Sequence, residues 1–140
     1  VMGKVLVAAR IANINDLFNA EQGITAPDAV RAVEVTDALV DTGATGLSLP
    51  SSLIARLGLS YLRTRSARTS AGVVQARVFG TVRLTVQDRD FASDVTELPD
   101  DCPVLIGQIP LEGMDFVVDP GGQRLIGNPA HGGEHIIELY

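Results

Sequence analysis

The sequence predicts an all-β domain with one or two short helices, and three observations support that fold class. Valine, isoleucine and threonine are frequent, 14 glycines and 7 prolines interrupt the chain, and many apolar segments alternate with polar residues. Of the 140 residues, 46% are hydrophobic and 20% are charged, as in an ordinary globular domain. Since a domain holds roughly 150 residues, we expect residues 1–140 to form a single domain.

The strands are predicted where β-branched and aliphatic residues alternate with polar ones or run together, with turn residues between them. Residues 104–106 are continuously apolar, which is typical of a short buried strand, and Gly80 predicts a bend in the longest strand. In chain order the expected strands cover residues 4–12, 32–40, 47–49, 61–69, 73–86, 91–98, 104–106, 116–119, 124–126 and 136–140.

Helical segments are expected to be short. Asn15 or Asp16 could cap the first helix and Gly23 could end it, within an insertion at residues 13–29 that separates the first two strands. Gly58 is suited to the C-terminal cap of the second helix, which follows a proline and two serines. The two helices and one further helical turn are expected over residues 17–21, 53–57 and 111–114.

Charge and cysteine content exclude several classes of protein. The chain has 11 lysines and arginines against 17 aspartates and glutamates, a net charge of −6 that disfavours a nucleic-acid partner. A single cysteine, Cys102, excludes an internal disulfide framework and a cysteine-rich zinc site. No apolar run approaches the ~20 residues of a membrane span, and the first residues lack the features of a signal peptide. We therefore expect a cytoplasmic protein without a membrane partner.

Two further polar patterns are given structural interpretations. The segment from His131 to His135 has the letters His-x-x-Glu-His of a zinc-protease motif, which must be helical to bind a metal. Its two central glycines disfavour a helix, so we expect no metal or other cofactor and place both histidines in a mobile loop. Asp115 and Asp119 flank an apolar strand, and we interpret them as turn or strand-end residues rather than as a second acidic pair.

The segment Ala38-Leu-Val-Asp41-Thr42-Gly43-Ala44 carries the most chemical information. A carboxylate that directly follows three apolar residues needs partners, because burying an unpaired charge is costly. Thr42 offers a hydroxyl and Gly43 permits a tight turn, so the loop can hold Asp41 at the floor of a cleft. For an isolated Asp-Thr-Gly the alternative is a capped turn after a strand.

Together with two other features, this segment resembles the active-site loop of retropepsin-like aspartic proteases. Val104-Leu105-Ile106-Gly107 is similar to the second apolar-apolar-glycine motif of that family, and the hairpin at 61–86 occupies the place of its flap. Residues 105–107 and 114–119 resemble bacterial members more closely. The resemblance covers residues 4–126 and implies an acid-protease barrel with one lobe per chain, a flap hairpin and a homodimeric assembly.

The resemblance implies an endopeptidase in which Asp41, Thr42 and Gly43 are the catalytic residues. This type of peptide hydrolysis uses two carboxylates that share one proton around a water. Only one Asp-Thr-Gly is present, so we expect a homodimer with one Asp41 from each copy. The Thr42 hydroxyls would link the two loops, and the substrate would be an extended peptide or protein. Its expected contacts are Ala44, Ser70, Ala71, Gly72, Val73, Ile106 and Gly107.

Departures from the viral pattern and a second function stay open. Gln108 stands where many viral members have an arginine, and Thr45-Gly46 replaces acidic residues, so ion pairs of the viral interface are not expected. Residues 134–140 are expected as an interface strand of the dimer, or else as a partner of the N-terminal strand. The alternative function is a non-catalytic dimeric peptide-binding or assembly module on the same fold. Such a module has no need of Asp41.

Overall fold

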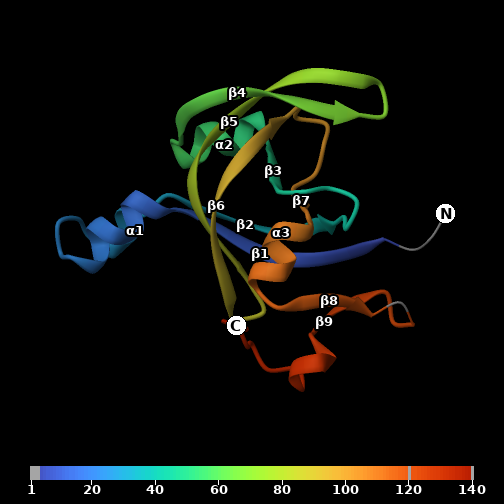
Figure 1. Ribbon diagram of the computed structural model, residues 1–140. Coiled ribbons are helices and arrows are strands. Elements are labelled where there is room, and N and C mark those ends of the chain that lie inside the picture. The colour runs from blue at the N-terminus through green and yellow to red at the C-terminus, as the bar shows by residue number, and fades with distance from the viewer. Residues whose placement is uncertain (1–3, 120, 140) are drawn as a thin grey trace.

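The computed structural model describes residues 4–119 and 121–139 and is mostly built of strands (Figure 1). Strands account for 50% of the chain and helices for 20%, so the predicted all-β class is confirmed. In chain order the strands are β1 (Val5–Asn13), β2 (Ala32–Val40), β3 (Leu47–Pro50), β4 (Ser60–Thr69), β5 (Gly72–Val86), β6 (Arg89–Leu98), β7 (Leu105–Ile106), β8 (Phe116–Asp119) and β9 (Arg124–Gly127).

The helices are short and lie between the strands. None of those in the described part of the chain is long and apolar enough to cross a membrane. They are the α-helices α1 (Ile14–Glu21), α2 (Ser51–Leu57) and α3 (Gln108–Gly113) and the 3-10 helices η1 (Pro27–Ala29) and η2 (Pro129–His131).

The main sheet has seven strands in the order β1-β2-β7-β3-β6-β5-β4. A further antiparallel ladder joins β1 to β5 and closes six of these strands into a barrel, which leaves β4 as an extension beside β5. Closure removes the exposed edges that an open sheet would present. The β4–β5 hairpin projects at the top of Figure 1, where its tip lies above β3 and β7 in this view. Strands β8 and β9 form a separate hairpin.

Side chains that point into the barrel form the hydrophobic core. Along β5 the buried residues Val82, Leu84 and Val86 alternate with half-buried ones, as expected for a strand with one face against the core. Ile54 and Leu57 of α2 are also buried and join this core. Gly58 ends α2 in the left-handed conformation at φ 62°, as predicted for its C-terminal cap.

Two helix starts differ from the prediction because side-chain and loop contacts decide them. Neither Asn15 nor Asp16 caps α1. The cap is Asn13, whose side-chain oxygen accepts a hydrogen bond from the Asp16 amide at 3.1 Å, so the helix begins at Ile14. Helix α3 begins at Gln108, three residues before the predicted turn, because the loop after β2 accepts hydrogen bonds from its first amides.

The C-terminal segment forms no strand over residues 134–139, and the last residue of the predicted 134–140 segment lies outside the described residues. A strand needs a neighbouring backbone that accepts and donates along its length. Here the Ile136 amide instead donates to the Asp115 side chain at 3.2 Å, so the segment is bound by side chains within its own chain.

Candidate active site

The loop of residues 41–46 connects β2 to β3 at the point where β2 lies beside β7. These two strands are parallel, with Leu39 opposite Leu105 and Val40 opposite Ile106. The Asp41 amide donates to the Ile106 carbonyl at 2.9 Å and therefore extends this ladder by one bond. The Asp41 carbonyl then accepts from the Ala44 amide at 3.0 Å, which turns the chain back toward β3.

Backbone hydrogen bonds hold this loop against the start of α3. Three loop carbonyls accept from three successive amides, with donor–acceptor distances of 2.8–2.9 Å. A Cβ atom on Gly107 would lie 2.5 Å from the Gly46 carbonyl oxygen and 2.7 Å from that of Ala44, so only glycine allows this approach. The donor and acceptor pairs are Gly107 and Gly46, Gln108 and Ala44, and Ile109 and Thr45.

The Asp41 carboxylate is half-buried and makes few contacts. Its Oδ1 accepts a hydrogen bond from the Gly43 amide at 2.9 Å. Within residues 4–119 and 121–139, neither Asp41 Oδ2 nor the exposed Thr42 hydroxyl has a hydrogen-bond partner. One carboxylate oxygen is thus held in place by the backbone while the other is available to a water, a substrate or a second carboxylate.

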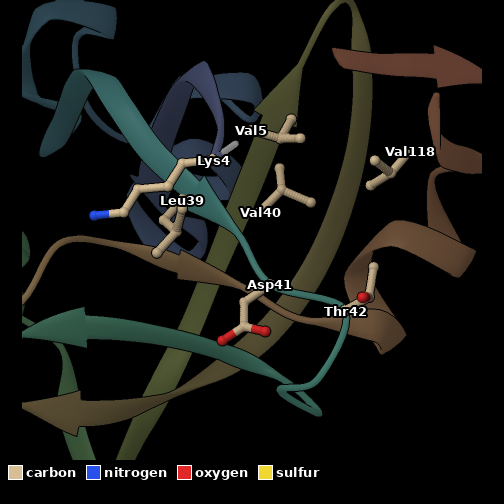
Figure 2. A pocket seen from close by; sticks show the side chains of 7 residues that line it. All are labelled: Lys4, Val5, Leu39, Val40, Asp41, Thr42 and Val118. Atoms are coloured by element: carbon tan, nitrogen blue, oxygen red, sulfur yellow. The ribbon is translucent and has the colours of Figure 1, made fainter. Parts of the chain in front are cut away.

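Asp41 and Thr42 border a hollow of about 390 Å³ (Figure 2). Most of its other side chains are apolar, and the amine of Lys4 extends to one side of the Asp41 carboxylate in this view. Lys4 was not predicted as a site residue. It directly precedes Val5, and Val5 pairs with Val40, the residue before Asp41, so pairing of the first two predicted strands is the signal that could have indicated it. The lining residues are Lys4, Val5, Leu39, Val40, Asp41, Thr42 and Val118.

The strand registers define which side chains share the face of the sheet that leads to Asp41. Directly opposed residues of neighbouring strands lie on one face, and so do residues two apart on one strand. Asp41 follows Leu39 by two positions and continues its face. We call the set opposed to Leu39 the Leu39 row, and it consists of Leu39, Leu105, Ser48, Thr96, Val78 and Arg63.

This register corrects the place predicted for Ile106. Ile106 has no exposed surface and lies in the core opposite Leu47, so it cannot contact a substrate in an open cleft. Its neighbour Leu105 is half-buried and lies in the Leu39 row. The two-residue apolar strand looks the same in either orientation, and only its register with β2 distinguishes the two faces.

The β4–β5 hairpin has its predicted turn, but its register changes one side-chain assignment. Thr69 pairs with Gly72, so the turn consists of Ser70 and Ala71, and the Thr69 hydroxyl accepts the Ala71 amide at 3.1 Å. Val73 lies on the face opposite to the Leu39 row, whereas Val74 lies on the same face as that row. Within the described residues no hydrogen bond or ion pair joins this tip to Asp41.

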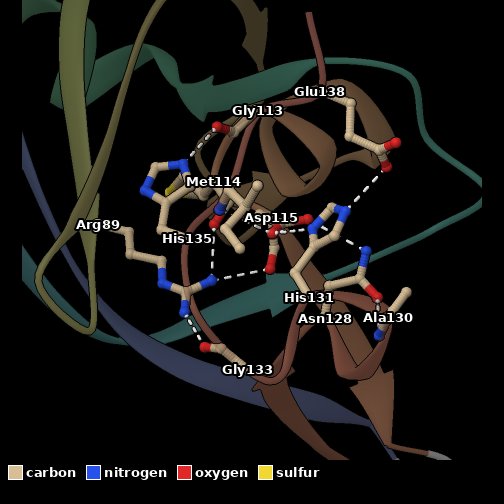
Figure 3. A network of polar contacts seen from close by, with 11 residues as sticks. Arg89, Gly113, Met114, Asp115, Asn128, Ala130, His131, Gly133, His135 and Glu138 are labelled. Atoms are coloured by element: carbon tan, nitrogen blue, oxygen red, sulfur yellow. Dashed lines mark hydrogen bonds and ion pairs between the residues drawn. The ribbon is translucent and has the colours of Figure 1, made fainter. Parts of the chain in front are cut away.

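Asp115, unlike Asp41, is surrounded by hydrogen-bond partners (Figure 3). Asp115 is 8% exposed and accepts hydrogen bonds from the Asn128 side chain at 3.1 Å and from the Ile136 amide. His131 Nδ1 lies 2.6 Å from Asp115 Oδ2, and His131 Nε2 lies 2.9 Å from Glu138 Oε2. The bond from His131 lowers the pKa of Asp115 to about 2, and the same contact raises the pKa of His131.

These contacts also show where the two histidines of the His-x-x-Glu-His segment lie. The helix η2 ends at His131, whose side chain is 14% exposed and packed between two carboxylates, so the prediction of a mobile loop is wrong for this residue. His135 instead contacts the Gly113 carbonyl at 3.2 Å. Within the part of the chain that the structure describes, no group of three histidine, cysteine, aspartate or glutamate residues is arranged to hold a metal ion.

Comparison with known proteins adds one finding. A family model described as "gag-polyprotein putative aspartyl protease" matches residues 32–119, which is more than half of the chain. The match runs from β2 to β8 and includes the Asp41 loop, the β4–β5 hairpin and Gly107. A search of curated proteins gives no match. The nearer likeness to bacterial members stays a prediction.

Proposed function

Since the chain belongs to the family of gag-polyprotein aspartyl proteases, we propose that it is an endopeptidase whose active site is completed by a second copy of the chain. Each copy contributes one Asp41, and the two carboxylates activate a water between them. One carboxylate accepts a proton from the water while the other, protonated, polarises the scissile carbonyl and later protonates the leaving nitrogen.

The observation that carries this proposal is the contact pattern of Asp41. Its Oδ1 accepts from the Gly43 amide, and its Oδ2 has no partner within the described residues. A carboxylate that is buried for a purely structural role has hydrogen-bond partners inside the protein. Two carboxylates about 3 Å apart cannot both ionise, so a pair of Asp41 residues would share one proton.

A homodimer is supported by the surroundings of this carboxylate. These 140 residues contain one Asp-Thr-Gly, and the hollow beside Asp41 is lined mainly by apolar side chains that a second copy would cover. The Thr42 hydroxyl is exposed and lies next in sequence to Asp41, where it could bond to the partner's loop. Residues 134–140 remain the proposed interface strand, which would have to leave its contacts with Asp115 to form a ladder.

The substrate is proposed to lie extended between the Asp41 loops and the β4–β5 hairpins. A hairpin tip that closes over an extended peptide satisfies the peptide backbone by β-augmentation. Ala44, Gly43 and the tip residues 70–72 would make backbone contacts, and side-chain pockets would be lined by Leu105 and Val74, which share the face of the Leu39 row. Gly107 also holds the loop in position, and its proposed contact with the substrate stays a prediction.

The test is cleavage of a diverse peptide library, read by mass spectrometry from about pH 4 to 7. We expect Asp41→Asn to reduce cleavage by more than about 1,000-fold. Asp37→Asn is the matched control, because Asp37 is an exposed residue of the same strand. Light scattering on each variant establishes whether the protein is dimeric.

Three results distinguish the possible functions. Cuts made by the wild type and by Asp37→Asn but not by Asp41→Asn would support the endopeptidase. Equal cleavage by Asp41→Asn would refute the catalytic role of this residue. A dimer that binds peptides without cutting any of them would support the non-catalytic peptide-binding module.

A further inference from the structure

Positive charge is concentrated in the segment that includes the β4–β5 hairpin. Residues 42–87 contain six arginines and no aspartate or glutamate, whereas the rest of the chain contains five basic and 17 acidic residues. Although the net charge of the chain is −6, the segment that includes and follows the Asp41 loop is therefore strongly basic. Such a local field attracts anionic groups even when the whole protein is acidic.

Three of these six arginines are already paired with carboxylates from other parts of the fold. Arg77 makes two hydrogen bonds with Glu97, at 2.7 and 2.8 Å, and Arg63 lies 3.0 Å from Asp94. Arg83 lies 3.7 Å from Glu21. These three ion pairs neutralise the arginines farther from the hairpin tip. The arginines of the outer half of the hairpin are not neutralised in this way.

Two arginines of the outer half, Arg65 and Arg68, are exposed and have no ion pair within residues 4–119 and 121–139. Arg65 is opposite Ala76 and two residues after Arg63, so it lies on the face of the Leu39 row. Arg68 is opposite Val73 and lies on the other face. Arg65 and Arg68 thus lie on the same strand, and both are exposed and without an ion pair in the described part of the chain. They differ in the face of the hairpin from which they project.

The face that Arg65 shares is otherwise poor in charge. Within the Leu39 row the side chains between Leu39 and Arg63 are uncharged, and Arg63 is neutralised by Asp94. A substrate lying along this face beneath the hairpin would therefore meet one uncompensated hairpin cation, Arg65, before it reaches the hollow that Lys4 and Asp41 line. Arginine pairs with a carboxylate through two parallel N–H···O bonds, a geometry that discriminates a glutamate from the neutral, equally large glutamine.

We propose that Arg65 gives the active site a preference for substrates that carry an acidic side chain in the stretch beneath the β4–β5 hairpin. The inference rests on the proposed peptidase function and adds the charge of its substrate. A peptide is favoured over a nucleic acid because the hairpin presents a single uncompensated cation, Arg65, on the face of the Leu39 row, whereas a polyanion would need several cations on one face.

The test compares glutamate and glutamine versions of the library peptide that the wild type cleaves fastest, substituted at each position in turn. At the best position we expect the wild type to prefer glutamate by about three- to fivefold in kcat/KM, the size of a single partly solvated ion pair. Arg65→Gln should abolish this preference, and added salt should weaken it. Arg68→Gln, on the opposite face, should retain it.

The same peptides are also measured for binding to Asp41→Asn by fluorescence anisotropy, which separates this inference from the proposed function. Cleavage that depends on Asp41 with an unchanged glutamate preference in Arg65→Gln would overturn the role of Arg65 and leave the peptidase intact. Absence of cleavage, with binding that prefers glutamate only when Arg65 is present, would support the role of Arg65 in a binding module. Absence of a preference in both measurements would overturn it.

Nucleic acid is the remaining outcome and is tested with a labelled single-stranded oligouridylate. Comparable losses of oligonucleotide binding in Arg65→Gln and Arg68→Gln, without any glutamate preference for peptides, would overturn the proposal and assign both faces of the hairpin to a phosphate backbone. Oligonucleotide binding that is undetectable in all variants, together with the peptide preference, would support it.

Discussion

Asp41 and Asp115 each follow an apolar or helical element, yet their surroundings are opposite. Within the described residues the Asp41 side chain accepts one hydrogen bond, from the amide two residues away. Asp115 accepts bonds from a histidine, an asparagine side chain and a distant amide, and these partners lie 13 to 21 residues further along the chain. A carboxylate whose oxygens have partners within the chain stabilises the fold, whereas a carboxylate with a free oxygen at the end of a strand is available for chemistry.

The difference also shows how the chain holds each group. The Asp41 loop is positioned by its backbone, through three hydrogen bonds from the start of α3, and its side chains stay free. The Asp115 site is positioned by side chains, with Arg89 donating to the carbonyls of Met114 and Asp115 at 3.0 and 2.8 Å. Backbone positioning suits a catalytic loop because it fixes the carboxylate without neutralising it.

The largest expected effect comes from applying the same isosteric substitution to both aspartates. Asp41→Asn should lose cleavage by more than about 1,000-fold while its melting temperature stays equal or rises, because two carboxylates no longer repel each other in the dimer. Asp115→Asn should melt several degrees lower, because His131 loses the more buried of its two carboxylate partners, and should still cleave within about threefold of the wild type below its transition. Calorimetry and peptide cleavage on both variants check this.

The contrast between the two aspartates would be wrong if Asp115→Asn lost cleavage or if Asp41→Asn lost stability. Loss of cleavage in a fully folded Asp115→Asn dimer would give Asp115 a part in the active site. A large fall in the melting temperature of Asp41→Asn would mean that the free oxygen of Asp41 has a structural partner in the assembled dimer.

A smaller effect is expected from the glycine that brings the loop and α3 together. Gly107→Ala places a methyl group 2.5 Å from the Gly46 carbonyl oxygen and should destabilise the protein by about 1–3 kcal/mol, with loss of cleavage as the loop shifts. Gly46→Ala is the matched control, because a Cβ atom there has no neighbour within 4 Å. Urea unfolding measures both. Equal stability of the two variants would show that the loop does not need this close approach.

Much of this molecule could be predicted from local patterns, and the side-chain assignments that could not be predicted depend on contacts between distant segments. Alternation located the strands, and Asp41 and Gly107 stood out because a charge and a glycine interrupt apolar runs. Which of Leu105 and Ile106, or of Val73 and Val74, faces the cleft depends on strand register, which is decided by pairing across the sheet. The partners of Asp115 come from a distant segment with no periodicity, so no local pattern predicts them.

The smallest expected effect is the pH dependence that the Asp115 site adds to stability. The pKa of Asp115 is lowered from 3.8 to about 2, so its contribution is complete above pH 3.8 and is lost as the pH falls toward 2. The pKa of His131 is raised above 6.5, so its contribution is complete below pH 6.5 and is lost as the pH rises through the folded value. Both contributions are present together between about pH 4 and 6.5, and the melting temperature should decline on either side. His131→Gln should remove the decline above pH 6.5. His135→Gln should retain it, because the His135 ring contacts the Gly113 carbonyl and not Asp115. A decline above pH 6.5 that persists in His131→Gln would place its origin elsewhere, and the Asp115 site would then be held by its asparagine and amide bonds alone.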